Sequence, residues 1–492
     1  MRSIVLVLLA LCLLVPAAFA VTISGTVVDL STGNPVANAS VWVKTINSAA
    51  TTDSDGTFTI VFVPNGRFEI SVSHVGYWSE TFTLSTEQKT NFRLEIRPKM
   101  YRSEGVTLSI DRVQRESATV PFTNVSAEEL SERYYGQDLP VALEGLPSMT
   151  TTTDAGSGLG YSYLNMRGFD FKRISVLLNG VMLNDPEDFY VYWVDLADFG
   201  ANVGDVQVQR GAGSALLGLP SAGGTIDVQT QTYSDKPAIS AEYGLGSYNT
   251  QRGSVHLASG PIQDRYFMDA RFSRITSDGY RDQSWSDYFS YYLSAARVDE
   301  NMTTRLVLFG GPIKNHMAYY GVSREQLAQD REQNPLTYED ETDNYYQPHY
   351  QLHNTWDIAD NLRLQNTLYY IRGEGFFNVS YPSWWGYGWD SWGLEDPGVA
   401  IGDMVARQHV ENHQGGWQPR LTWKLNDHTL DIGGQYISHR SRHYGELIWG
   451  AVLPDGTEPN HVWCDYEGRK RIISGYVQDR WKVTPRLYLN GA

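Results

Sequence analysis

His443, Glu446 and His461 have the residue types of a zinc-peptidase site, and their order loosely follows the spacing of such sites. His443 falls at the end of an expected strand, and the other two fall in an expected loop. No segment around them has the pattern of a peptidase domain. We therefore predict no catalytic residue and no cofactor, and we expect a protein that is not an enzyme.

Two histidine pairs, His349 with His353 and His409 with His413, each share one face of an expected strand, because residues four apart on a strand point the same way. Such a pair holds a metal only when a neighbouring strand supplies another ligand. Solvated histidines, or histidines that line a lumen, are the simpler interpretation. We predict no metal site.

Residues 1–20 have the pattern of a cleavable export signal. Arg2 precedes an unbroken apolar run over residues 4–15, and an A-x-A end closes at Ala20. The run is too short to span a bilayer, which takes about 20 apolar residues. Leu11 before Cys12 does not suit a lipoprotein signal. We expect cleavage after Ala20.

Composition limits the class of the exported chain. Mean hydropathy is -0.36, and no second apolar run of helix-spanning length follows the signal, so membrane insertion would require a β-barrel. The 31 Tyr and 14 Trp suit the aromatic girdles of barrels, although carbohydrate-binding proteins are also rich in aromatics. Without Cys12, Cys464 is left alone, which argues against a small disulfide-stapled fold. An excess of 56 acidic over 39 basic residues disfavours nucleic acid as a partner.

Residues 21–97 alternate short β-type runs with turn clusters, which predicts six or seven strands in a small β-sandwich. The segment resembles the carboxypeptidase regulatory-like domain through three motifs. These are Ser24-Gly25-Thr26-Val27-Val28-Asp29, Thr52-Asp53-Ser54-Asp55-Gly56-Thr57-Phe58 and His74-Val75-Gly76-Tyr77. This module is non-catalytic in its family. Asp53 and Asp55 could form half of a calcium loop, but the six-position ligand spacing and the closing Glu are absent.

Residues 98–119 form a polar linker, and residues 120–232 contain the densest run of recognisable motifs. The motifs are Asn165-Met166-Arg167-Gly168-Phe169, Val176-Leu177-Leu178-Asn179-Gly180-Val181-Met182-Leu183-Asn184-Asp185, Val206-Gln207-Val208-Gln209-Arg210-Gly211, Ser214-Ala215-Leu216-Leu217-Gly218 and Gly223-Gly224-Thr225-Ile226-Asp227-Val228. In this order and at this spacing they resemble the plug domain of TonB-dependent outer-membrane receptors. Asn179, Ala212 and Leu217 stand where the family more often has Asp, Pro and Tyr. The resemblance implies an α+β plug inside a barrel.

Arg167 and Arg210 would then lie in a lumen of polar and acidic side chains. A buried guanidinium needs carboxylate partners, so pairing with inward Asp or Glu of the barrel wall would lock a removable plug. The alternative is that both arginines hold the plug's own sheet together.

Residues 233–492 show the period-two alternation of a sheet with one apolar and one polar face. Met268, Ala270 and Phe272, for example, alternate with Asp269 and Arg271. Tight turns are expected at Asp299-Glu300-Asn301, Asp360-Asn361, Asn426-Asp427 and Thr484-Pro485, between long segments at 312–344, 373–404 and 445–468. Short turns on one side and long extracellular loops on the other are typical of outer-membrane barrels.

The strands that we expect number ten or eleven, whereas plugged transporters use about 22. We therefore expect a mainly β chain that ends with about half of a transmembrane antiparallel barrel. The sequence would be the N-terminal portion of a longer receptor.

The resemblance implies energised import of an extracellular ligand, with TonB as the periplasmic partner. In the family a short TonB box precedes the plug and pairs with TonB as an added strand. Our candidate is the run Glu104, Gly105, Val106, Thr107, Leu108, Ser109 and Ile110. The alternative is that this run is only a linker.

Ligand contacts are expected at the plug apices, where aromatic rings could stack on a siderophore ring or a sugar face. The candidates are Tyr161, Tyr163, Phe189, Tyr190, Tyr192 and Trp193, unless these rings pack against the barrel. A tryptophan-rich loop over residues 381–392 is a candidate lid, a partner surface or a packed loop.

The ligand class stays open. The loop that begins at Asn315 resembles loops of iron-complex importers, which favours an iron-siderophore or another metal chelate. The N-terminal domain resembles extensions of receptors that import glycans with a surface lipoprotein, so a glycan or peptide importer is the alternative. A passive porin or adhesin is the alternative of another class. The resemblance implies the outer membrane of a Gram-negative bacterium, with barrel strands in its lipid and the N-terminal domain in the periplasm.

Overall fold

The structure of the chain is a computed structural model. It describes residues 20–30, 33–74, 77–87, 89–97, 120–211, 221–231, 233–234, 236–484 and 487–491. Residues 1–19 of the predicted signal, the candidate TonB box at 104–110 and the motif residues 214–218 lie outside these ranges. The chain divides into two compact units, residues 1–104 and residues 105–492.

The described residues of the first unit form seven strands and one 3-10 turn. These are β1 (Ala20–Asp29), β2 (Ser40–Val43), η1 (Lys44–Ile46), β3 (Ser48–Thr51), β4 (Thr57–Pro64), β5 (Arg67–His74), β6 (Tyr77–Ser85) and β7 (Asn91–Ile96). They form a three-stranded sheet in the order β4-β1-β7 and a four-stranded sheet in the order β3-β2-β5-β6. Alternate residues of β7, such as Phe92 and Leu94, enter one apolar core with residues of β2 and β5. Two β-sheets around one core agree with the predicted sandwich.

The second unit begins with the predicted plug, which combines a five-stranded sheet, a hairpin and short helices. Its strands are β8 (Phe122–Ser126), β9 (Met149–Thr153), β10 (Ser162–Met166), β11 (Ile174–Leu178), β12 (Val181–Met182), β13 (Val203–Arg210) and β14 (Gly224–Thr230). Its helices are α2 (Ala127–Ser131), α3 (Leu139–Ala142), η3 (Phe171–Arg173), η4 (Trp193–Leu196) and η5 (Phe199–Asn202). The large sheet has the order β12-β11-β14-β13-β8, and β9 pairs with β10.

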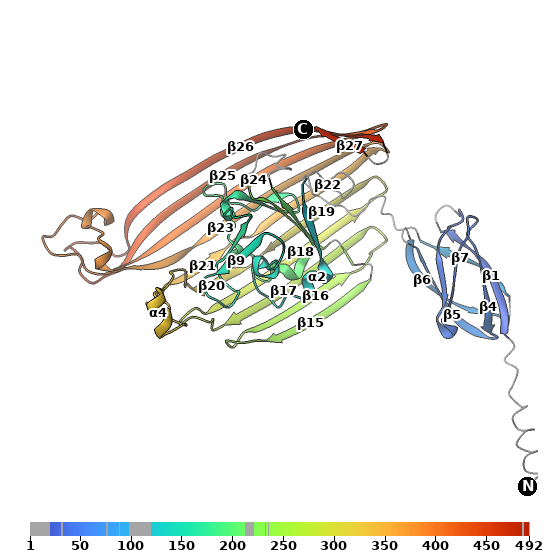
Figure 1. Cartoon of the computed structure of the whole chain (residues 1–492), viewed down its shortest axis with the longest axis horizontal. Coiled ribbons are helices and arrows are strands. Elements are labelled where there is room, and N and C mark those ends of the chain that lie inside the picture. The colour runs from blue at the N-terminus through green and yellow to red at the C-terminus, as the bar shows by residue number, and fades with distance from the viewer. Residues whose placement is uncertain are drawn as a thin grey trace, which may run out of the picture. The chain divides into compact units, whose positions relative to one another are not determined.

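The rest of the second unit is one 13-stranded antiparallel sheet, which we call the wall sheet. Its strands are β15 (Pro237–Leu245), β16 (Gln251–Ser259), β17 (Tyr266–Ser277), β18 (Ser286–Val298), β19 (Met302–Gly310), β20 (Pro312–His316), β21 (Thr342–Tyr346), β22 (His349–Ala359), β23 (Leu362–Tyr381), β24 (Met404–Leu425), β25 (His428–Gly450), β26 (His461–Thr484) and β27 (Leu487–Gly491). The long strands curve, and the plug lies within the curve (Figure 1).

Strands β18 and β19 of the wall sheet each have one face toward the plug. On β18, Tyr288 and Tyr292 are buried and join the apolar clusters of the plug, whereas Phe289 between them is 41% exposed. Val307 and Phe309 of β19 enter the same plug core. This alternation confirms the predicted period-two pattern and separates a plug-facing side of the wall sheet from an outer side.

Turns and long segments alternate as predicted, but the strands reach further than the sequence pattern indicated. Residues 312–316 and 342–344, expected in a loop, lie in β20 and β21, and β23 continues to Tyr381. β25 and β26 likewise extend into the 445–468 segment. A strand that passes beyond lipid has no need of an apolar face, so its end carries no alternation to reveal it. The remaining connections hold α4 (Arg324–Gln329), η6 (Ser383–Trp385) and η7 (Trp389–Trp392).

A break in two neighbouring strands separates β19 from β20 and β21 from β22. β18 pairs with β19 over its second half and with β20 at its start, so β19 and β20 follow one path along β18. At the break, a Cβ on Gly311 would lie 1.8 Å from the Phe289 carbonyl oxygen, so only glycine fits.

Among the described residues, no helix is long and apolar enough to cross a membrane.

Candidate functional site

The apical loop of the plug, residues 183–192, is fixed by a buried asparagine. The Asn184 side chain accepts a hydrogen bond from the Val176 amide at 2.8 Å and donates to the carbonyls of Ile174 and Phe189, each at 3.0 Å. The loop then returns on itself, because the Asp185 amide donates to the Tyr190 carbonyl at 2.7 Å. The asparagine of the sequence motif thus holds an acidic loop above strand β11.

A pocket of about 140 Å³ lies between this loop and the wall sheet. Its lining combines five carboxylates with aromatic and polar groups. The lining residues are Tyr161, Asp185, Glu187, Asp188, Tyr192, Asp195, Asp343, Tyr345, Gln347, Phe377, Val410, Asn412 and His443. Pockets for organic ligands usually measure about 300–1,000 Å³, so this one would take a small group or one part of a larger ligand.

Burial changes the proton affinity of the plug carboxyls in this pocket. Burial raises the pKa of Asp185 to about 6. The pKa of Asp195 is well above its usual range because of burial and the nearby Asp343 and Asp185 charges. Burial acts in the same direction on Glu187, but hydrogen bonds from Ser441 and His443 outweigh it and lower the pKa of that carboxyl. Crowded acids of this kind favour a cation as neighbour.

The wall holds the pocket's edges in place. The Tyr161 hydroxyl donates to Asp343 on β21 at 2.7 Å, and His443 Nε2 on β25 lies 2.8 Å from Glu187 Oε2. Lys470 on β26 donates to the Pro186 carbonyl. Plug loop and wall therefore share one polar network.

The six aromatic residues predicted to bind ligand do not form one group. Tyr161 and Tyr192 line the pocket, whereas Trp193 is 3% exposed and packs in the plug core. Tyr190 stacks on Tyr192, with ring centroids 5.6 Å apart. Tyr163 and Tyr190 both contact Phe171, which the sequence analysis did not single out, and Phe189 lies under the Lys470 ammonium.

The sequence analysis also missed the acids of the apical loop. The run Asp185-Pro186-Glu187-Asp188 was a readable signal, since it places three carboxylates in four residues of one plug loop. Asp343 carried no such signal, because only folding brings β21 to this loop.

The two arginines predicted to lock the plug lie in different settings. Arg210 Nη1 donates to Thr123 of the neighbouring plug strand β8 at 2.8 Å. Arg167 has a left-handed backbone (φ 54°) just after β10. Whether either residue locks the plug stays a prediction, and the contact of Arg210 supports the alternative that it holds the plug's own sheet.

Two arginines of the wall connect it to the plug. Arg305 on β19 is 2% exposed and donates to the Thr230 hydroxyl at 3.0 Å. Arg252 on β16 forms a 2.8 Å ion pair with Asp198, which also accepts from the Tyr134 hydroxyl. Arg305 could have been found from the sequence, because it is an arginine on the same face of an alternating strand as the buried Val307 and Phe309.

The two histidines and the glutamate that resembled a zinc-peptidase set each have a different partner. His443 contacts Glu187, Glu446 pairs with His409 at 3.0 Å, and His461 lies 2.8 Å from the Trp392 carbonyl. The tryptophan-rich loop is partly packed: Trp389 and Trp392 are buried, whereas Trp384 is 80% exposed.

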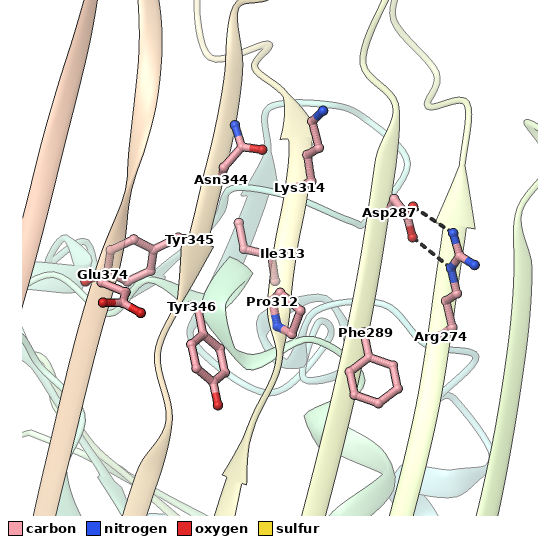
Figure 2. Close-up of a pocket in the computed structure, with 10 residues that line it drawn as sticks. All are labelled: Arg274, Asp287, Phe289, Pro312, Ile313, Lys314, Asn344, Tyr345, Tyr346 and Glu374. Carbon is pink, nitrogen blue, oxygen red and sulfur yellow. Dashed lines mark hydrogen bonds and ion pairs between the residues drawn. The ribbon is translucent and has the colours of Figure 1, made fainter. Parts of the chain in front are cut away.

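A second, larger hollow of about 650 Å³ opens on the outer side of the wall sheet, at the strand break. Figure 2 shows Arg274 on β17 joined to Asp287 on β18 by two hydrogen bonds, with Phe289 and Tyr346 further along the strands. The described residues that line it all belong to wall strands. Along the strands, the side chains that line the hollow change from charged to aromatic, which is typical of the edge of a lipid-facing band.

Comparison with protein families identifies two parts of the chain. Residues 23–108 match the CarboxypepD_reg-like domain, and residues 114–225 match the TonB-dependent Receptor Plug Domain. Both matches agree with the resemblances in the sequence. The second family is one of non-enzymatic transporters.

Solved structures share the fold of the chain at low sequence identity. The ferric-catecholate import receptor Fiu from E. coli K12 in its open form has a TM-score of 0.56 and 17% identity, over 76% of this chain and 58% of that one. The ferric citrate transporter FecA in the unliganded form gives 0.58 and 16%, over 74% and 54%. The siderophore receptor PiuA from Acinetobacter baumannii gives 0.56 and 15%, over 78% and 59%. The chain therefore spans between 54% and 59% of the length of these three proteins.

Proposed function

We propose that this TonB-dependent receptor, which carries an N-terminal CarboxypepD_reg-like domain, binds an extracellular ligand and imports it into the periplasm. The observation that carries the proposal is a plug domain packed against a curved antiparallel sheet, with a pocket at their junction. TonB-dependent receptors reside in the outer membrane of Gram-negative bacteria. The N-terminal domain would then lie in the periplasm.

Import would require the plug to move relative to the wall, and the contacts suggest where a ligand acts. A ligand in the pocket touches both the apical loop and the wall. The loop is continuous with β12 and β11, and Asn179 after β11 donates to Gln351 of the wall at 3.0 Å and accepts from the Thr230 amide. Movement of the loop would strain these contacts, and TonB would complete the release by pulling on the candidate box at 104–110.

The preferred ligand class is a metal chelate, in line with the resemblance of the loop that begins at Asn315. The acidic lining of the pocket narrows this class, since it disfavours an anionic chelate and favours a neutral or cationic one. A glycan or peptide importer with a surface lipoprotein remains the second candidate, favoured by the exposed Trp384 in the tryptophan-rich loop.

Deletion of residues 120–232 tests transport through a plugged barrel against a passive porin. We expect the deletion strain to admit large antibiotics nonspecifically and to lose uptake of the natural ligand. Immunoblots of outer-membrane fractions check that the variant is still inserted. A strain with unchanged permeability and unchanged uptake would contradict the proposal.

A further inference from the structure

Two acids of the apical loop and a histidine of the wall bring three ligating atoms together. One carboxylate oxygen each from Asp185 and Glu187 and one ring nitrogen of His439 all lie within 4.8 Å of one another. The two acids come from the plug and the histidine from β25. This group lies at the edge of the pocket, because Asp185 and Glu187 also line it.

His439 is the unusual member of the group. It is only 3% exposed, yet neither ring nitrogen has a hydrogen-bond partner among the described residues. Its nearest acidic neighbour is Glu187 Oε1, at 3.9 Å from Nε2. A buried imidazole without a partner loses free energy relative to water, so its place beside two carboxylates needs a reason.

We propose that Asp185, Glu187 and His439 bind a divalent transition-metal ion that joins the apical loop of the plug to strand β25. Such an ion would supply the partner that His439 lacks and neutralise the two carboxylates. Ligand atoms about 2.1 Å from a tetrahedral zinc lie about 3.4 Å apart, so small side-chain rotations close the present spacing.

The donor types select the metal. Imidazole with carboxylates suits zinc and its neighbours, whereas Ca²⁺ and Mg²⁺ prefer shells of oxygen atoms alone. Neighbouring residues already hold the Glu187 carboxylate in position. Ser441 donates to one of its oxygens, and His443 Nε2 lies 2.8 Å from the other. Lys470, a cation close to this loop, is held on the Pro186 carbonyl.

Three protein ligands leave a tetrahedral ion one open position. Because Asp185 and Glu187 line the pocket, that position is reached from the pocket, where water or a donor atom of a bound molecule would complete the coordination. The site does not depend on import: the ion would bind to the resting protein.

The test is zinc binding to the chelator-washed, full-length protein in detergent, by isothermal titration calorimetry and metal analysis. We expect one Zn²⁺ per chain at this site, at least about tenfold weaker binding in His439→Ala and in the isosteric Glu187→Gln, and no competition from excess Ca²⁺. The matched control is His428→Ala on the same strand, where the histidine pairs with Asp479 at the far end. The control should bind zinc like wild type.

A second readout reports the link between plug and wall. Zinc should slow amide exchange of residues 183–192 in wild type and in His428→Ala, but not in Glu187→Gln. Equal zinc affinity in wild type, His439→Ala, Glu187→Gln and His428→Ala would overturn the proposal. Displacement of the bound zinc by Ca²⁺ would overturn it too. Loss of ligand uptake with zinc binding intact would count against the proposed function instead, since binding is measured without transport.

Discussion

Single buried polar residues decide how the plug is held and how it responds to pH. Asp138 is 5% exposed, and burial raises its pKa to about 7, although the Ser162 hydroxyl donates to it. The pKa of an aspartate in an unfolded chain is about 3.9. The folded state therefore binds a proton more tightly than the unfolded state does, and stability falls as pH rises from about 4 through 7.

Asp138→Asn should remove this pH dependence. Asparagine keeps an acceptor for Ser162 and has no charge to bury, so the variant should gain thermal stability relative to wild type at about pH 8 but not at about pH 4. The measurement is the unfolding midpoint in detergent at both pH values. A gain of equal size at the two pH values would show that Asp138 is already ionised in the folded protein.

Arg305 should matter more than any surface arginine. Replacement by alanine leaves Thr230, Tyr292 and Ser294 without their donor, a cost of about 1–3 kcal/mol for each buried group left unsatisfied. We expect a lower unfolding midpoint and greater sensitivity to large antibiotics, because the plug loses a contact with the wall. Arg265→Ala is the matched control, since its side chain is 50% exposed. Equal effects of the two substitutions would refute a special role for Arg305.

At the scale of strands and loops, the sequence predicted element types better than element ends. Alternation in β17 predicted the wall sheet, because one face of such a strand is apolar and the other is polar. The break between β19 and β20 could not be predicted, since it depends on how closely Gly311 approaches β18. The pocket was half predicted: Tyr161 and Tyr192 line it, but Asp343 and His443 reach it from distant strands.

Gly311→Ala tests the break directly. The added Cβ would meet the Phe289 carbonyl, so β18 and β20 must separate, and we expect less folded protein in the outer membrane. Gly321→Ala is the control, because a Cβ at this position would meet no described atom within 4 Å. The readout is the fraction of heat-modifiable protein on gels. Normal assembly of both variants would mean that the break tolerates a side chain.

At the scale of the whole molecule, the central claim is energised import through a plugged barrel. The family matches cover the N-terminal domain and the plug, and the wall sheet follows the fold of solved receptors. These parts could be predicted from short motifs with fixed local geometry. The ligand could not, because the pocket joins residues that lie far apart in the sequence.

The most direct test is uptake and growth on single iron, cobalamin or glycan sources, with and without deletion of residues 104–110. The full-length gene product, with and without the deletion, is compared at equal abundance in the outer membrane. We predict that the deletion abolishes uptake and growth on one source while surface binding of that ligand is unchanged. Unchanged uptake of a source that requires the gene would contradict TonB-coupled import through this segment.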